Sequence, residues 1–163
     1  MLASLAESLA AGEAAALVDA GGSLDPRAAT AAGLTLPALL WIRCTPAQAL
    51  KAADLVVAAG GFGVVGVDVC DARPRAPDAA WMRLAHLART QSTTLLVAGA
   101  ERMAGTHAAA ALELGNVTPG FLTDGPPLLS GIRVRATRVR GDRRAPQPGD
   151  PTACVSLAFT SRS

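Results

Sequence analysis

Lysine is nearly absent from this sequence. The 163 residues include one lysine, Lys51, against fourteen arginines. In a P-loop, a lysine that follows a G-x-x-x-x-G pattern and precedes Ser or Thr binds the nucleotide phosphates. Lys51 lies instead in the segment QALKAADL, which contains no glycine. The chain therefore lacks a Walker A motif, and we expect neither ATPase activity nor a bound cofactor.

Cysteine and histidine are also scarce. Three cysteines, Cys44, Cys70 and Cys154, are far apart, no C-x-x-C pattern occurs, and His86 and His107 are isolated. Metal sites need clustered ligands, and nucleophilic catalysis needs a nucleophile beside a base. The sequence therefore predicts no metal site and no catalytic triad. We expect the three thiols to be reduced and buried, since free cysteine behaves as a small apolar side chain.

Long apolar runs are missing as well. None approaches the roughly 18 residues that a transmembrane helix requires. The N-terminal segment MLASLAESLAAGEAAALVD carries Glu7 and Glu13 and no basic residue, which indicates an amphipathic helix rather than a signal peptide. We therefore expect a cytoplasmic protein without membrane contact. Half of the residues are hydrophobic, which favours a globular protein over a disordered one, and the length of 163 residues predicts a single domain over residues 1–163.

Charge is distributed unevenly along the chain. Residues 1–72 contain seven acidic and three basic residues, whereas residues 73–163 contain six acidic and twelve basic ones. The net charges of the two parts are therefore −4 and +6. The basic part can face nucleic acid or an acidic partner, or it can be an ordinary solvated surface.

Helical and strand patterns alternate over residues 1–114. The strands are continuously apolar instead of alternating, which predicts an α/β fold with a mostly parallel central sheet and helices on both faces. Residues 115–163 differ, because a turn-rich segment precedes two β-rich runs. We expect strands at 15–19, 39–44, 64–69 and 93–98, and helices at 2–11, 26–33, 46–60, from 78, and at 106–114.

The β-rich runs at 132–140 and 153–160 are joined by a polar, proline-rich segment. This pattern predicts a C-terminal antiparallel hairpin at the edge of the sheet, where arginines discourage unwanted strand pairing. The candidate contacts to a partner or to DNA are the arginines of this hairpin and its connection: Arg133, Arg135, Arg138, Arg140, Arg143 and Arg144.

The segment AAGGFGVVGVDVCD contains a glycine pattern and an acidic pattern. Gly61, Gly63 and Gly66 fit G-x-G-x-x-G, but a dinucleotide-binding loop must follow a strand and open a helix. Here a helix comes first and a strand follows, so we interpret these glycines as a helix end and a turn. The apolar strand that ends in Asp68 resembles a Walker B strand, whose acid helps to hold Mg²⁺. A loop or helix cap is an equally simple role for Asp68.

Several segments together resemble the RecA family. ALVDAGGSLDPRAATAAGL, CTPAQALKAADLVVAAGGFGVVGVDV and QSTTLLVAGAERMAG are similar to RecA's core strands and helices, and the likeness extends over about residues 2–105. The resemblance implies a RecA-like three-layer core in which Asp68 keeps the Walker B position. The P-loop and the N-terminal polymerising segment of RecA have no counterpart here.

The departures from RecA affect its catalytic and DNA-binding positions. Gly21 stands where RecA has its catalytic glutamate, and Gly99-Ala100 stands where its γ-phosphate-sensing glutamine is found. The first DNA-binding loop is deleted, and we expect a helical stretch at 107–114 in place of the second. The resemblance therefore implies a vestigial Asp68 and a protein that is not an enzyme.

The chain is rich in alanine, and it contains the segments LLWIR, WMRLA, AGTHAAAALEL and GIRVRATRVRGDRR. With these features, the degenerate RecA-like chain resembles the ImuA family of bacterial mutasome accessory proteins. That likeness implies a role in the DNA damage (SOS) response and in mutagenic translesion synthesis, beside an ImuB-type polymerase relative and an error-prone DnaE-type polymerase. It also leaves room for direct DNA contact and for a homo-oligomer through the core. Two alternatives stay open: a RecA-type ATP-dependent recombinase relative that lacks its N-terminus, and an unrelated α/β small-molecule enzyme.

Overall fold

A computed structural model describes residues 1–70, 76–121, 129–140 and 153–158. Its backbone contacts divide the chain into two compact units, an N-terminal unit (Met1–His107) and a C-terminal unit (Ala108–Ser163). Each unit is described by itself, and the expectation of a single domain over residues 1–163 stays a prediction. Within the described residues, no helix is long and apolar enough to cross a membrane.

The N-terminal unit alternates helices and strands, as its apolar pattern predicts. The N-terminal helix ends at Ala10, within one residue of its expected end, and all four expected strands form within two residues of their predicted bounds. The elements are α1 (Leu2–Ala10), β1 (Ala14–Asp19), α2 (Pro26–Ala31), β2 (Leu39–Arg43), α3 (Ala49–Ala59), β3 (Phe62–Val69), α4 (Asp78–Thr90) and β4 (Thr94–Gly99).

Local sequence signals explain where these helices begin and end. The Asp25 carboxylate accepts a hydrogen bond from the Arg27 backbone N–H at 2.9 Å and so caps α2. Without this acceptor, the N–H would have no partner within the helix. Thr45 and Gln48 form a capping box at the short 3₁₀ turn that leads into α3. Gly60 ends α3 with a φ of 71°, a backbone conformation that glycine adopts without strain.

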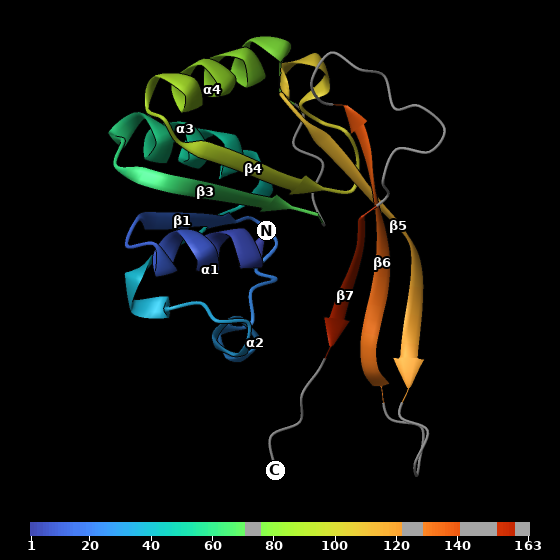
Figure 1. Cartoon of the computed structure of the whole chain (residues 1–163). Helices are drawn as coiled ribbons and strands as arrows, with labels where there is room; N and C mark the ends of the chain where they lie inside the picture. The colour runs from blue at the N-terminus through green and yellow to red at the C-terminus, as the bar shows by residue number, and fades with distance from the viewer. Residues whose placement is uncertain (71–75, 122–128, 141–152, 159–163) are drawn as a thin grey trace. The chain divides into compact units, whose positions relative to one another are not determined.

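The four strands of the N-terminal unit form one parallel sheet in the order β2-β1-β3-β4. Helices α3 and α4 cover one face of this sheet, and α1 and α2 cover the other (Figure 1). The expectation of a parallel sheet with helices on both faces is confirmed. The apolar pattern predicts the sheet correctly because the inner strands β1 and β3 are buried on both sides, so both are apolar apart from the glycines of β3 and an aspartate near each carboxyl end.

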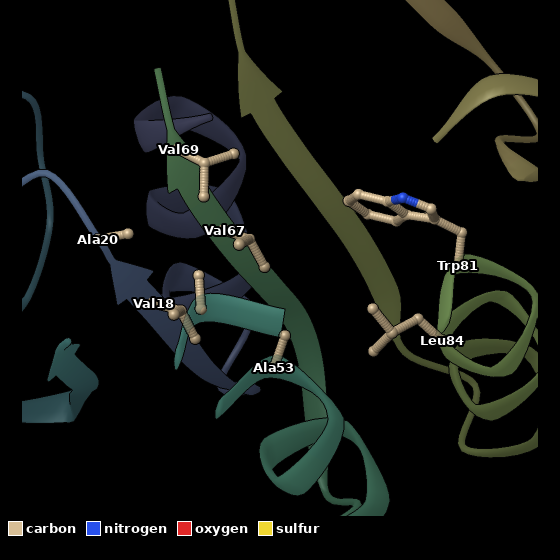
Figure 2. Close-up of a cluster of buried hydrophobic side chains, with 8 residues drawn as sticks. Val18, Ala20, Ala53, Val67, Val69, Trp81 and Leu84 are labelled. Atoms are coloured by element: carbon tan, nitrogen blue, oxygen red, sulfur yellow. The ribbon is translucent and has the colours of Figure 1, made fainter. Parts of the chain in front are cut away.

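The core of this unit lies mainly between the sheet and helices α3 and α4. Val18, Val67 and Val69 point from the two inner strands toward Trp81 and Leu84 of α4 (Figure 2). These side chains are at most 4% exposed, and burial of each contributes about 1.5–3 kcal/mol relative to full exposure. A second cluster, on the opposite face, gathers around Leu5 of α1 and Ala29 of α2. The inner strands are therefore fixed from both sides.

The glycine pattern lies between α3 and β3 and continues into β3 itself. A strand follows the turn directly, as expected, so the glycines do not open a helix as a dinucleotide-binding loop requires. Gly61 has a φ of 82° in the turn. Gly63 lies in the strand, where a Cβ would collide with the carboxylate of Glu13 and come within 2.8 Å of the Ser8 hydroxyl oxygen. The glycines thus serve a turn and a close approach of neighbouring side chains.

The C-terminal unit contains a three-stranded antiparallel sheet (Figure 1). Its strands are β5 (Ala111–Phe121), β6 (Leu129–Arg140) and β7 (Ala153–Ala158), and β6 is the middle strand. The predicted antiparallel pairing of the two C-terminal runs is confirmed by β6 and β7. The expected place at the edge of the parallel sheet is wrong, because β6 pairs on both sides within this separate sheet.

The expected helix at 106–114 is also wrong. A short 3₁₀ turn covers Gly105–His107, and β5 begins at Ala111. The alanines and leucine of this segment favour a helix locally, but β6 offers a long antiparallel partner, and strand pairing overrides the local preference. β5 also continues to Phe121, through residues that suggest turns, because Asn116, with a φ of 50°, opens a bulge opposite Val134.

Candidate functional site

Two aspartates meet at the carboxyl ends of the inner strands. Asp19 is the last residue of β1 and Asp68 is the penultimate residue of β3, and the two are register partners. The chain leaves β1 toward β2 on one side and later crosses back to β3 on the other. In open α/β sheets, the crevice at such a reversal of strand order is the usual place for a ligand.

Asp19 is buried and fully engaged by its own chain. Only 1% of the residue is exposed. One carboxylate oxygen accepts the backbone N–H of Ser23 at 3.0 Å, and the other accepts the indole N–H of Trp41 at 3.1 Å. The second oxygen also receives the Leu24 N–H at 3.4 Å. A buried charge persists only when it is paired or hydrogen-bonded, so these three donors explain how Asp19 is tolerated there.

Asp68 is held in a similar way. The Ser23 hydroxyl donates to one of its carboxylate oxygens at 2.7 Å, and the Cys70 N–H donates to the other at 3.0 Å. Partial burial works to raise the pKa of Asp68, but the hydrogen bonds from Ser23 and Cys70 outweigh it and hold the pKa below its ordinary value. Both oxygens of the predicted Walker B residue therefore stabilise the strand end.

The two aspartates together fix the loop after β1. Ser23 donates its backbone N–H to Asp19 and its hydroxyl to Asp68, so one residue joins the ends of two adjacent strands. A carboxylate whose pKa is lowered is a weak general base, so Asp68 is poorly suited to activate the Ser23 hydroxyl. The arrangement is that of a structural anchor. The pairing partner of Asp68 was missed from the sequence, although VDA in β1 and VDV in β3 both end apolar strands in aspartate.

Two positions that the sequence resemblance matches to functional residues of RecA, Gly21 and Gly99, carry no side chain. Gly21 is exposed in the loop after β1. A Cβ at Gly99 would collide with the methyl group of Met103, so the end of β4 is covered by an apolar side chain. Lys51 is exposed on the first turn of α3. Among the residues that the structure describes, no three histidine, cysteine or acidic side chains gather as potential metal ligands.

Arg43 and Trp41 of β2 lie beside Asp19, because β2 pairs with β1. The guanidinium of Arg43 lies 5.7 Å from the ring centroid of Trp41, within the range of a cation–π contact. Cys44, which follows β2, is half-buried, and burial together with the negative charge of Asp19 raises the pKa of its thiol. The expectation of buried thiols fails for Cys70, which is exposed, and the side chain of Cys154 lies outside the description.

The structure separates the predicted arginines. Arg133 and Arg135 are exposed and two residues apart on β6, so they lie on one face of the sheet. Arg138 is exposed but three residues further on, so it belongs to the opposite face, and the pairing of Leu112 with Arg138 agrees. Arg140 ends β6, and the positions Arg143 and Arg144 lie outside the described residues.

The face that carries Arg133 and Arg135 is polar. Thr118 is the register partner of Arg133, Gly115 that of Arg135, and Glu113 pairs with the next residue on this face. None of these residues is aromatic, so they do not offer the bases a stacking platform of the kind that single-strand-binding sheets use. Two arginines in this spacing are well suited to binding carboxylates or phosphates.

No protein-family model matches the chain, and no curated protein is significantly similar to it.

Proposed function

We propose that this chain is a non-catalytic, RecA-like accessory protein of the bacterial DNA damage response, similar to the ImuA family. In this proposal it is cytoplasmic and docks translesion polymerase subunits, namely an ImuB-type polymerase relative and an error-prone DnaE-type polymerase. The parallel sheet with helices on both faces is compatible with such a core. The resemblance of the sequence segments to RecA supplies the rest of the argument.

The hydrogen bonding of Asp68 is the observation that supports a non-catalytic role. A Walker B aspartate acts by turning its carboxylate toward Mg²⁺ and the water around it. Here, both oxygens of Asp68 accept hydrogen bonds from the loop after β1 and from the backbone that follows β3. With Gly21 at the position of the catalytic glutamate, this strand end is built to hold the fold.

Arg133 and Arg135 supply the proposed contact to the partner. Both are exposed on the same polar face of β6, and guanidinium groups in this spacing bind acidic side chains or phosphates. A double change of Arg133→Glu and Arg135→Glu reverses the charge of this face. The matched control is Arg138→Glu, since Arg138 is also exposed and lies on the same strand but on the opposite face.

The test is a binding measurement with a purified ImuB-type partner, repeated at several salt concentrations. The proposal predicts loss of binding in the double variant and near-normal binding in Arg138→Glu. Equal binding by all three proteins would remove the arginine face from the proposal. If duplex DNA replaces the protein partner and affinity falls steeply with salt, the face contacts phosphates directly, because binding then releases counterions.

The ATP-dependent alternative makes a different prediction. A RecA-type ATPase relative hydrolyses ATP in the presence of Mg²⁺, and Asp68→Asn abolishes that hydrolysis. The accessory-protein proposal predicts no binding at millimolar ATP and no hydrolysis, by either the wild type or Asp68→Asn. Measurable hydrolysis that depends on Asp68 would replace the proposal with the ATPase function.

A further inference from the structure

The sheet of the C-terminal unit has one polar and one strongly apolar face. Opposite the arginine-bearing face, the pairing of β5 with β6 places a row of apolar residues on the second face. Five of them form what we call the apolar patch, and each is between 46% and 67% exposed: Leu112, Leu114, Val117, Phe121 and Leu129.

Register confirms that these residues share a face. Leu114 pairs with Ala136, and Phe121 pairs with Leu129. Val117 is the extra residue of the bulge opposite Val134, which directs it to the same side. Because residues directly opposite each other in an antiparallel pair point to the same face, the patch extends along the whole length of β5.

Such a patch calls for a cover. A sheet with one apolar face is stable only when that face packs against another layer. Five side chains at these exposures present roughly 500 Å² of apolar surface, near the upper end of what monomeric proteins expose in one patch. By contrast, the N-terminal unit has two large exposed hydrophobic side chains on its helices, Leu55 on α3 and Met82 on α4, and a few exposed apolar residues are ordinary on a protein surface.

We propose that the apolar patch packs face to face against the same patch of a second copy of this chain. Two such patches bury about 1,000 Å² together, which reaches the lower limit for a specific interface. Two antiparallel sheets that stack in this way form a sandwich with their strands about 30° apart. The basic faces with Arg133 and Arg135 then point outward, away from each other.

Charge placement favours a two-fold arrangement. Among the described side chains, Arg138 is a charged one beside the patch, where it pairs with Leu112 at one end of β5. In a dimer whose two-fold axis runs across the strands at the middle of the patch, the two β5 strands are antiparallel, so the two Arg138 side chains lie at opposite ends of the interface. The patch is thus compatible with its own copy, because it brings no like charges together. This inference does not depend on the proposed function.

The test compares two leucines of nearly equal exposure. Leu114 is 67% exposed in the patch, and Leu55 is 63% exposed on α3. Sedimentation equilibrium of the full chain should show a dimer for the wild type and for Leu55→Glu. Leu114→Glu should raise the dissociation constant of the dimer by about a hundredfold, as expected for a buried interface residue that is replaced by a charge.

Leu114→Met serves as the conservative variant and should dimerise like the wild type. Because Leu114 is largely exposed in a single chain, Leu114→Glu should keep the circular dichroism spectrum of the folded monomer. A monomeric wild type would overturn the proposal, as would a Leu114→Glu protein that dimerises normally. Loss of the dimer in Leu55→Glu would place the interface on the N-terminal unit and would overturn it as well.

Discussion

Replacing Asp19 by alanine should destabilise the N-terminal unit strongly. Asp19→Ala removes the acceptor of the Ser23 N–H at 3.0 Å and of the Trp41 indole N–H at 3.1 Å. A hydrogen bond to a charged group contributes about 1.5–3 kcal/mol. Ser23 is exposed and Trp41 is half-buried, so water can partly replace the lost acceptor. Removing the buried charge offsets part of this loss. We therefore expect the free energy of unfolding to fall by about 3 kcal/mol.

Asp25→Ala is the matched control, since it removes an aspartate from the other end of the same loop. Asp25 is exposed and caps α2 through one hydrogen bond, so its loss should cost about 1 kcal/mol. Urea unfolding followed by the fluorescence of Trp41 and Trp81 measures both variants, because both tryptophans lie in the N-terminal unit. An Asp19→Ala protein no less stable than Asp25→Ala would refute the reasoning about the strand-end anchor.

Three smaller effects test other parts of the structure. Asp68 has a pKa below its ordinary 3.8, so its ionised form stabilises the fold above that pH. This stabilisation disappears as the pH falls through the lower pKa of the folded state. The difference in unfolding free energy between the wild type and Asp68→Asn, measured by denaturant titration, should therefore shrink in acid. The Cys44 thiol, with a pKa above 9.0, should react with iodoacetamide more slowly at pH 9 than free cysteine does, which mass spectrometry can follow. Gly63→Ala should destabilise the fold by about 1 kcal/mol, since its Cβ collides with Glu13, whereas Gly115→Ala, which meets open space, should be neutral in thermal unfolding.

The sequence was most informative where local signals and burial agree. Asp25 and Pro26 mark the start of α2, the Thr45–Gln48 box marks the entry to α3, and Gly60 marks its end, and the structure has all three. Up to the aspartate near each carboxyl end, the inner strands consist of apolar residues and glycine, because both faces of the sheet are covered. These features could be predicted because the residues that cause them lie next to one another in the chain.

The C-terminal unit shows where this reasoning fails. The segment at 106–114 favours a helix by composition, and Gly115, Pro119 and Gly120 suggest turns. Nevertheless, β5 pairs with β6 along its length except at the bulge. Pairing with the distant β6 decides that this segment forms a strand, and the residues of the segment itself do not indicate that pairing. The same holds for the arginines, which form one row in the sequence but face two sides of the sheet.

The anchor at the strand ends was half predicted. Asp68 was singled out from its strand, whereas Asp19 was not, although both end apolar runs in the same way. Their proximity follows from the order β2-β1-β3-β4, which makes the two strands neighbours. Sequence pattern identified a parallel sheet but not the order of its strands, so it did not bring the two carboxylates together.

Affinity capture with the full chain from DNA-damaged bacterial cells tests the central claim most directly. The wild type and the Arg138→Glu control should recover subunits of an error-prone polymerase, and the Arg133→Glu/Arg135→Glu variant should lose them. Recovery of no polymerase subunit by the wild type would contradict the account of this chain as a docking protein of translesion synthesis.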